Sequence, residues 1–135
     1  MSYTEELFGI KDKVYVLTGG GGVLAGAIAE GIAKAGAKVA LLDIRIENAQ
    51  KRAELINKNG GVAKAYETNV LDLSVLEKTR DEINKDFGDI DVLINLAGGN
   101  MAGASIMPDQ TIFDLKVPDF EKVVNLNLNG TVLPT

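Results

Sequence analysis

The stretch TGGGGVLAGAIAEGIAKAGAKVALLD, from Thr18 to Asp43, determines how the rest of the chain is interpreted. Four consecutive glycines, Gly19 to Gly22, follow the apolar run Lys13–Thr18 and precede an alanine-rich segment, Val23–Ala35. Glycine loses more conformational freedom on folding than any other residue, so four in a row need a structural reason. Because they lie between a predicted strand and a predicted helix, they indicate a tight turn rather than a flexible linker.

The same alternation of short apolar runs and longer helical periods continues along the chain. Further strands are predicted at Lys38–Asp43, Val62–Glu67 and Asp91–Asn95, and further helices at Glu47–Asn59, at 74–87 and from about Pro118. The helix at 74–87 is expected to begin with a capping box, Ser74-x-x-Glu77. Apolar strands that alternate with helices are typical of an α/β fold with a parallel sheet. Right-handed crossovers then predict a doubly wound, Rossmann-type sheet with strand order 3-2-1-4.

Composition and charge exclude several classes of function. The net charge is −5 and no basic stripe is present, so nucleic acid is not an expected partner. The absence of cysteine and histidine removes disulfides, thiolate nucleophiles, histidine bases and Cys/His zinc sites, and we predict no metal site. No apolar run reaches the roughly 18 residues of a membrane span, and the polar N-terminus lacks the core of a signal peptide. We therefore expect a cytoplasmic protein without a membrane partner.

The glycine turn has the features of a phosphate site. Free N–H groups and the dipole at a helix start favour an anion, and glycines let the backbone approach a pyrophosphate closely. Gly20-x-Gly22-x-x-Ala25 matches the dinucleotide pattern G-x-G-x-x-A. Asp43 ends the second strand, near the spacing at which a carboxylate binds the adenosine ribose. This carboxylate would repel a 2′-phosphate and so favours NAD over NADP, although Arg45 lies close enough to soften that preference.

Two other nucleotide sites use a glycine-rich turn. A mononucleotide P-loop needs Lys and Ser or Thr after its last glycine, but Ala27 and Ile28 follow Gly26, so we reject this site. A methyltransferase that binds S-adenosylmethionine combines a similar turn with an acidic residue after its second strand. The sequence leaves this second alternative open.

In order along the chain, four motifs resemble those of the short-chain dehydrogenase/reductase family. Thr18-Gly19 matches the start of the family's T-G-x-x-x-G-x-G, although Val23 and Ala25 replace its later glycines. Asn69-Val70 resembles the family's Asp-Val pair, Asn95-Leu96-Ala97-Gly98 its N-N-A-G, and Asn127-Leu-Asn-Gly130 its N-x-x-G. The resemblance covers essentially the whole chain.

The resemblance implies roles for particular residues. Those expected to bind the cofactor NAD are Gly19, Gly22, Val23, Leu24, Asp43, Asn69, Val70, Leu96, Ala97 and Gly98. The glycine turn would bind the pyrophosphate, Asp43 the ribose, and Asn69-Val70 the adenine. Asn127 is the expected catalytic residue, because the family uses this asparagine with Ser, Tyr and Lys to hold a water in a proton relay.

The family mechanism also requires a Tyr-x-x-x-Lys motif, which this chain lacks. None of Tyr3, Tyr15 and Tyr66 has a lysine four positions later. We therefore expect residues 1–135 to be the N-terminal part of a single NAD-binding Rossmann domain, truncated and inactive by itself.

For the whole protein, the resemblance implies an NAD-dependent oxidoreductase that interconverts a secondary alcohol and a ketone of a small-molecule substrate. The four-glycine motif and the loop Ala97–Leu115 look similar to oxidoreductases of sugar acids, such as D-mannonate and D-fructuronate. Asn100 and Gln110 are candidates to bind polyol hydroxyls. Family members are commonly tetramers, so a homo-oligomer is expected. The alternative is a non-catalytic module that binds NAD.

Overall fold

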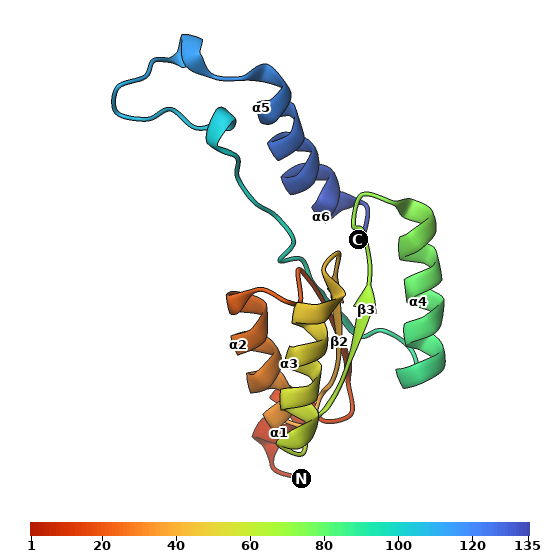
Figure 1. The fold of residues 1–135 in the computed structure, drawn as a ribbon. Helices are drawn as coiled ribbons and strands as arrows, with labels where there is room; N and C mark the ends of the chain where they lie inside the picture. The colour runs from red at the N-terminus through yellow and green to blue at the C-terminus, as the bar shows by residue number, and fades with distance from the viewer.

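The computed structural model describes all residues from Met1 to Thr135. Its centre is a four-stranded sheet in the order β3-β2-β1-β4, in which every pair of neighbours is parallel (Figure 1). The strands are β1 (Val14–Thr18), β2 (Lys38–Asp43), β3 (Val62–Glu67) and β4 (Val92–Ile94). The predicted α/β class and the predicted strand order are confirmed. β4 is one residue shorter at each end than predicted and lies at the edge of the sheet.

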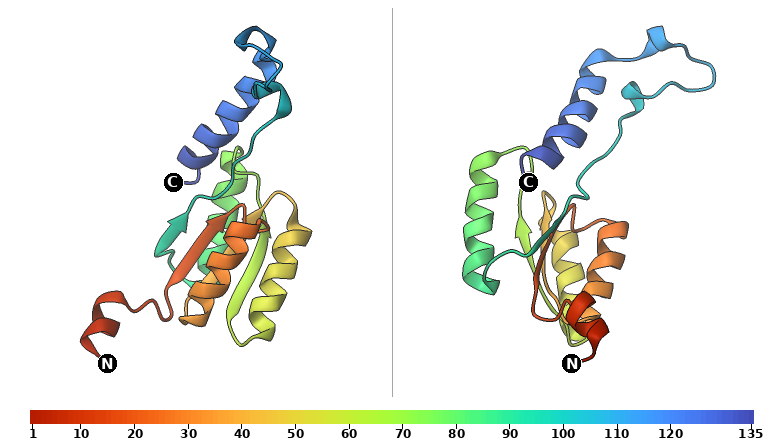
Figure 2. Two further views of the ribbon diagram at one scale, coloured as in Figure 1. Left: turned by 90° about the vertical axis from the view of Figure 1, so that its left-hand side faces the viewer. Right: turned by 180° about the vertical axis from the view of Figure 1, so that it is seen from behind.

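Helices cover both faces of this sheet. α2 (Val23–Lys34) and α3 (Ile46–Lys58) lie on one face, and α4 (Leu73–Phe87) lies on the other (Figure 2). α2 and α3 present mainly alanines to the strands, including Ala29 and Ala49, which have no exposed surface. These small side chains let the helices approach the sheet closely.

Side chains along the two central strands alternate between two hydrophobic cores. Leu17 and Leu41 belong to the core beneath α2 and α3. Their neighbours Val16 and Leu42 belong to the core beneath α4, which is completed by Ile83 of that helix. The strands are therefore buried on both faces, which explains why their sequences are almost continuously apolar.

The parallel strands end at one common edge, where the loops after them gather. Backbone hydrogen bonds continue the ladder beyond the strand ends: the Gly20 N–H donates to the Leu42 carbonyl at 2.8 Å, and the Thr68 N–H to the Asp43 carbonyl at 3.0 Å. The loops after β1 and β3 are thereby tied to the end of β2, at the edge where an α/β sheet binds ligands.

The start of α4 differs from the predicted capping box. The N-cap is Asp72, not Ser74, because the Asp72 carboxylate accepts a hydrogen bond from the Val75 N–H at 3.2 Å. Ser74 instead donates its hydroxyl to this carboxylate at 2.8 Å. The Ser74 and Val75 hydrogen bonds together lower the pKa of Asp72. An Asp two positions before a Ser offers two possible caps, and the sequence prediction selected the wrong one.

A short N-terminal helix, α1 (Tyr3–Phe8), was not predicted. A capping box between Ser2 and Glu5 begins it: the Glu5 N–H donates to the Ser2 hydroxyl, and the Ser2 N–H donates to the Glu5 carboxylate. None of its residues is buried, and Figure 2 shows it projecting from the sheet. A helix without a buried face gives no apolar periodicity, which is why the pattern missed it.

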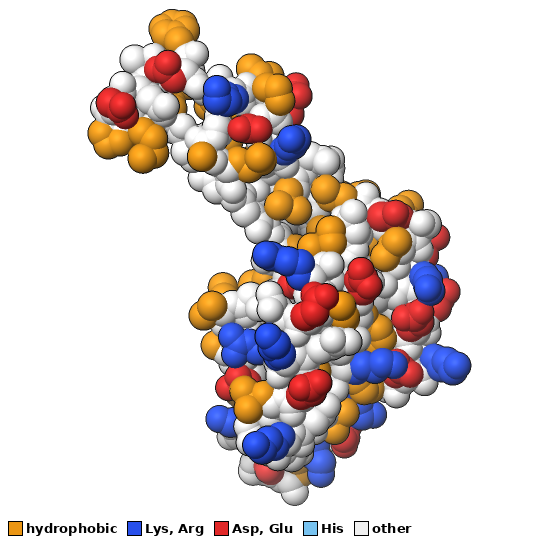
Figure 3. Space-filling view, in the orientation of Figure 1, with side chains coloured by type: hydrophobic (Ala, Val, Ile, Leu, Met, Phe, Trp, Pro, Cys, Tyr) orange, Lys and Arg blue, Asp and Glu red, His pale blue; other side chains and the backbone are white.

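The segment after β4 forms an arm that extends away from the sheet (Figure 1). The predicted loop contains two 3₁₀ turns, η1 (Ala102–Ala104) and η2 (Ile112–Asp114). A continuous helical segment follows: α5 (Val117–Val124), the π-helical η3 (Asn125–Asn129) and α6 (Gly130–Val132). Figure 3 shows hydrophobic side chains on this arm, and those exposed include Ile106, Met107, Ile112, Phe113, Val117 and Phe120. None of the helices is both long and apolar enough to cross a bilayer.

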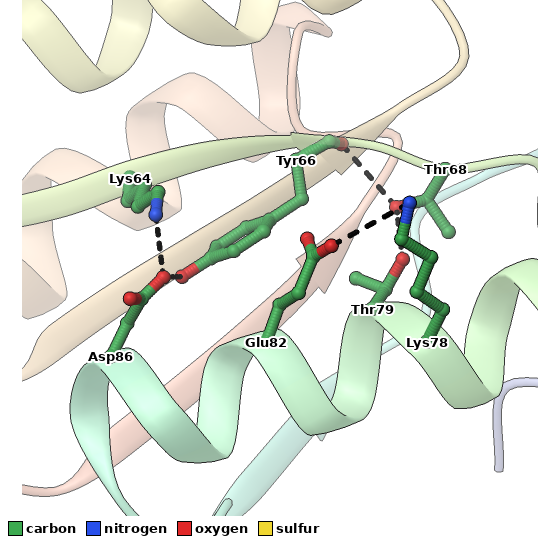
Figure 4. Close-up of polar contacts among 7 residues, drawn as sticks. All are labelled: Lys64, Tyr66, Thr68, Lys78, Thr79, Glu82 and Asp86. Atoms are coloured by element: carbon green, nitrogen blue, oxygen red, sulfur yellow. Dashed lines mark hydrogen bonds and ion pairs between the residues drawn. The ribbon is translucent and has the colours of Figure 1, made fainter.

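Polar contacts join β3 to α4 (Figure 4). The Tyr66 hydroxyl donates to the Asp86 carboxylate at 2.7 Å, and Lys64 pairs with the same carboxylate at 2.6 Å. Burial of the ring, followed by this hydrogen bond, raises the pKa of Tyr66. The Lys64 and Tyr66 hydrogen bonds lower the pKa of Asp86. These three side chains form what we call the β3–α4 clamp.

Candidate cofactor-binding site

The gathered loops enclose a cleft of about 340 Å³ at the carboxyl edge of the sheet. It lies above β1, where strand order reverses between β2 on one side and β4 on the other, the usual ligand position in such sheets. The residues that line it are Gly19, Gly21, Gly22, Leu42, Asp43, Ile44, Arg45, Asn48, Thr68, Asn69, Val70, Leu96, Ala97, Gly98 and Leu126.

A second hollow, of about 390 Å³, lies beneath α4. Its walls are mainly apolar and include Leu76, Ile83 and Leu93. None of the glycines of the β1–α2 loop lines it, and neither does Asp43. The cleft at the carboxyl edge is therefore the candidate site, although it is the smaller of the two.

The β1–α2 loop requires glycine for two physical reasons. Gly19 has a φ of 64°, in the left-handed region that side chains disfavour, and a Cβ there would lie 2.9 Å from the Leu96 carbonyl oxygen. A Cβ on Gly20 would lie 2.8 Å from the Leu41 Cβ. The backbone at Gly19 and Gly20 thus lies so close to Leu96 and Leu41 that a side chain at either position would clash.

Val23 and Leu24 begin α2 immediately beyond this loop. Their N–H groups donate to no backbone acceptor, and no side chain caps the helix at Gly22. Their side chains are 83% and 64% exposed and do not line the cleft. Any contact of Val23 or Leu24 with a ligand in the cleft would therefore come from the main-chain N–H groups, which favour a bound anion.

Asp43 is fixed at the end of β2 by two hydrogen bonds. Its Oδ2 accepts from the Gly21 N–H at 2.9 Å, and its Oδ1 accepts from the Arg45 N–H at 2.8 Å. Each carboxylate oxygen can accept more than one hydrogen bond, so both can still accept from hydroxyl groups. Arg45 also lines the cleft and forms no ion pair, so one anionic and one cationic side chain border this end of it.

Asn69 and Val70 form the wall contributed by the loop after β3. Asn69 Oδ1 accepts from the Leu71 N–H at 3.0 Å, so this amide oxygen is already part of a turn. Val70 is 6% exposed, and a Cβ on Gly130 would lie 3.2 Å from its Cγ2. The absence of a side chain at Gly130 lets the helical segment after β4 lie against this loop.

Asn127 lies on the π-helical segment and binds the loop after β4. Its Nδ2 donates to the Gly99 carbonyl at 2.8 Å, and its Oδ1 accepts from the Gly99 N–H at 3.2 Å. Nδ2 also donates to the Val123 carbonyl at 2.8 Å. The side chain therefore positions the Gly98–Gly99 backbone, and Leu126 rather than Asn127 lines the cleft.

Thr18 is a residue whose contribution the sequence analysis missed. Its hydroxyl oxygen accepts from the Leu96 N–H at 3.0 Å and from the Ala97 N–H at 3.1 Å, and the residue has no exposed surface. These bonds join the end of β1 to the loop after β4, whose Leu96 and Ala97 line the cleft. The motif T-G marked the position, but its partners lie far away in sequence.

The structure thus gathers most of the predicted cofactor residues around one cleft. Those that line it are Gly19, Gly22, Asp43, Asn69, Val70, Leu96, Ala97 and Gly98. Val23, Leu24 and Asn127 lie beside it without lining it. Five further residues that line the cleft were not predicted from the sequence, because they carry no motif of their own: Leu42, Ile44, Asn48, Thr68 and Leu126.

The comparisons with known proteins agree with this geometry. The family model for short chain dehydrogenases matches residues 13–135. This chain belongs to the short-chain dehydrogenase family. It is 43% identical over 136 residues to an uncharacterized oxidoreductase of Haemophilus influenzae, a match that covers 93% of this chain and 48% of that protein.

Two solved members of the family contain the cofactor. A Haemophilus influenzae protein provisionally named a D-mannonate oxidoreductase, with bound NAD, has a TM-score of 0.87 and 42% identity; the match covers 94% of this chain and 49% of that one. An NAD⁺-bound xylitol dehydrogenase has a TM-score of 0.82 and 30% identity, over 93% of this chain and 46% of that one. The chain therefore spans about half the length of the relatives it matches.

Proposed function

We propose that the cleft binds NAD and that the chain is the cofactor-binding, N-terminal part of an NAD-dependent dehydrogenase. The observation that carries this proposal is the placement of Asp43 across the glycine loop from the unpaired N–H groups of Val23 and Leu24. The residues fit the dinucleotide: the N–H groups suit its pyrophosphate and the carboxylate suits two ribose hydroxyls. The NAD-bound relatives support the same assignment.

Asp43 also supports NAD as the preferred cofactor over NADP. Its hydrogen bonds with Gly21 and Arg45 leave a fixed negative charge where a 2′-phosphate would lie. Repulsion between two anions at close range weakens binding, and the single Arg45 nearby only partly offsets it. A methyltransferase site is disfavoured by the family membership of the chain.

For the whole protein we propose oxidation of a secondary alcohol of a sugar acid or polyol, or the reverse reduction. When bound, NAD⁺ would accept a hydride from the substrate carbon during oxidation, and NADH would return a hydride during reduction. This chain's residues bind and orient the dinucleotide, and Asn127 keeps the Gly98–Gly99 loop in place beside it. Two NAD-bound relatives, one provisionally named a D-mannonate oxidoreductase and the other a xylitol dehydrogenase, support this substrate class.

The loop after β4 offers little support for a particular substrate. Asn100 accepts from the Met101 N–H and donates to Ser105, and Gln110 accepts from the Met107 N–H. Both candidate amides therefore stabilise turns within their own loop. A non-catalytic module that binds NAD remains the second proposal, and the absence of tyrosine and lysine from the cleft favours it for the chain alone.

Fluorescence titration with NADH and NADPH tests cofactor binding. We expect the chain to bind NADH at least about tenfold more tightly than NADPH, a difference of about 1.4 kcal/mol. Asp43→Ala should weaken NADH binding and reduce the preference, while Asp109→Ala, in the distant arm, should change neither. Equal affinity of the unaltered chain for both nucleotides would contradict the assignment of Asp43.

A further inference from the structure

The glycine loop depends on Asp43 for the position of its central residue. Of the loop's N–H groups, that of Gly20 donates to the Leu42 carbonyl and that of Gly22 closes back on the Gly19 carbonyl at 3.0 Å. The Gly21 N–H has no backbone acceptor and donates only to Asp43 Oδ2, at 2.9 Å. The centre of the loop is therefore bound to the rest of the protein through one carboxylate.

The surroundings of Gly21 show how closely the loop lies against its neighbours. A Cβ on Gly21 would lie 2.6 Å from the Asn48 Cβ and 2.9 Å from Asp43 Oδ2. The loop is thus seated between the end of β2 and the first turn of α3. A hydrogen bond to a carboxylate is roughly twice as strong as one between neutral groups, so it can hold a chain that has no side chains of its own to pack.

The second carboxylate oxygen prevents the group from turning away. Oδ1 accepts from the Arg45 N–H at 2.8 Å, at the N-cap of α3, while Oδ2 holds the loop. Rotation of the carboxylate would break both bonds together. Asp43 therefore bridges the start of α3 to the glycine loop, and Gly22, the residue after Gly21, is the N-cap from which α2 begins.

We propose that Asp43 is a positioning residue for the phosphate-binding loop, in addition to the ribose contact assigned to it above. This inference rests on the proposed function, because it concerns the same cleft. Loss of the carboxylate frees Gly21 and disturbs the N–H groups of Val23 and Leu24 that follow it. Its removal therefore weakens the binding of a phosphate ligand that contains no ribose at all.

The test compares two probes that each represent one part of the dinucleotide. Inorganic pyrophosphate and adenosine are titrated separately into ¹⁵N-labelled chain, and amide exchange with water is measured at Gly21. In Asp43→Ala we expect the Gly21 amide to exchange about tenfold faster and the affinity for pyrophosphate to fall about fivefold. Asp109→Ala is the control, since it removes a carboxylate from the arm, away from the cleft, and both Gly21 exchange and pyrophosphate affinity should stay unchanged.

The possible results separate the inference from the proposed function. If Asp43→Ala weakens adenosine alone and leaves pyrophosphate affinity and Gly21 exchange unchanged, the positioning role is wrong while NAD binding stands. If the unaltered chain binds neither NADH nor pyrophosphate, the proposed function itself fails. Asp43→Asn, which keeps the shape of the side chain and one acceptor oxygen, should give intermediate values and serves if Asp43→Ala does not fold.

Discussion

Thr18 joins the end of β1 to the loop after β4, and its hydroxyl is the only protein acceptor for two N–H groups of that loop. Replacement by valine keeps the shape of the side chain but leaves the N–H groups of Leu96 and Ala97 without a partner. Because both donors are only part-buried, each should cost near the lower end of the roughly 1–3 kcal/mol typical of an unpaired group, so we expect Thr18→Val to lower the free energy of unfolding by about 2 kcal/mol. Urea denaturation followed by circular dichroism measures this loss.

The matched variant is Thr18→Ser, which keeps the hydroxyl and removes a buried methyl group. It should cost about 1 kcal/mol, the usual value for one buried carbon. A valine variant as stable as the serine variant would show that the two hydrogen bonds contribute little. NADH binding should weaken in Thr18→Val as well, because the Leu96 and Ala97 backbone forms one wall of the cleft.

Single residues were predictable where the chemistry is local. Gly19 and Asp43 stand out because a turn and a strand end are visible in a short stretch of sequence, and both line the cleft. The bonds of Thr18 to Leu96 and of Asn127 to Gly99 connect distant parts of the chain, and no spacing rule reports them. Only the structure shows that Thr18 and Asn127 hold the loop after β4 in position.

Among the elements, β3 and α4 are joined by the clamp of Tyr66, Lys64 and Asp86, and its stability depends on pH. The pKa of Tyr66 is raised in the folded chain, whereas a tyrosine in an unfolded chain ionises near pH 10. The stabilisation is therefore complete below about pH 10 and is lost as pH rises beyond it. We expect the urea midpoint to fall as the pH rises above 10, and to fall less steeply in Tyr66→Phe.

Tyr66→Phe should also lower the free energy of unfolding by about 1 kcal/mol at neutral pH, since the hydrogen bond to Asp86 is lost. Tyr15→Phe provides the control: Tyr15 donates no hydrogen bond, and its substitution should leave the neutral-pH stability nearly unchanged. If the alkaline loss were identical in Tyr66→Phe and the unaltered chain, lysine deprotonation rather than this phenol would be responsible.

The hydrophobic periodicity of the sequence predicted where the helices and strands lie, but it predicted their first and last residues less accurately. β2 and β3 have the predicted bounds because buried strands between helices leave clear apolar runs. α1 was not predicted because none of its side chains is buried. The N-cap of α4 was misassigned because Ser74 and Asp72 are both good N-cap residues. The direction of the arm after β4 could not be predicted, since exposed hydrophobic side chains give no information about where a segment lies.

At the scale of the whole molecule, the topology was predictable because right-handed crossovers leave few ways to arrange four parallel strands. The position of the cleft followed from that topology. The structure also shows where the three tyrosines, the candidate proton donors of the chain, lie relative to the cleft. Tyr66 is buried and bonded to Asp86, Tyr3 lies on α1, Tyr15 lies on β1, and no tyrosine or lysine lines the cleft.

This arrangement predicts that the 135-residue chain binds NADH but does not catalyse the reaction. Proton transfer from a substrate hydroxyl requires a titratable side chain within hydrogen-bond reach, and only Asp43 and Arg45 border the cleft, at the end assigned to the ribose. With NAD and either D-mannonate or xylitol, we expect no increase in NADH absorbance above the rate without protein. The same preparation must bind NADH in the titration, so that inactivity is not a failure to fold. A rate that rises with chain concentration and disappears in Asp43→Ala would overturn this prediction, because it would place a complete catalytic site within these residues.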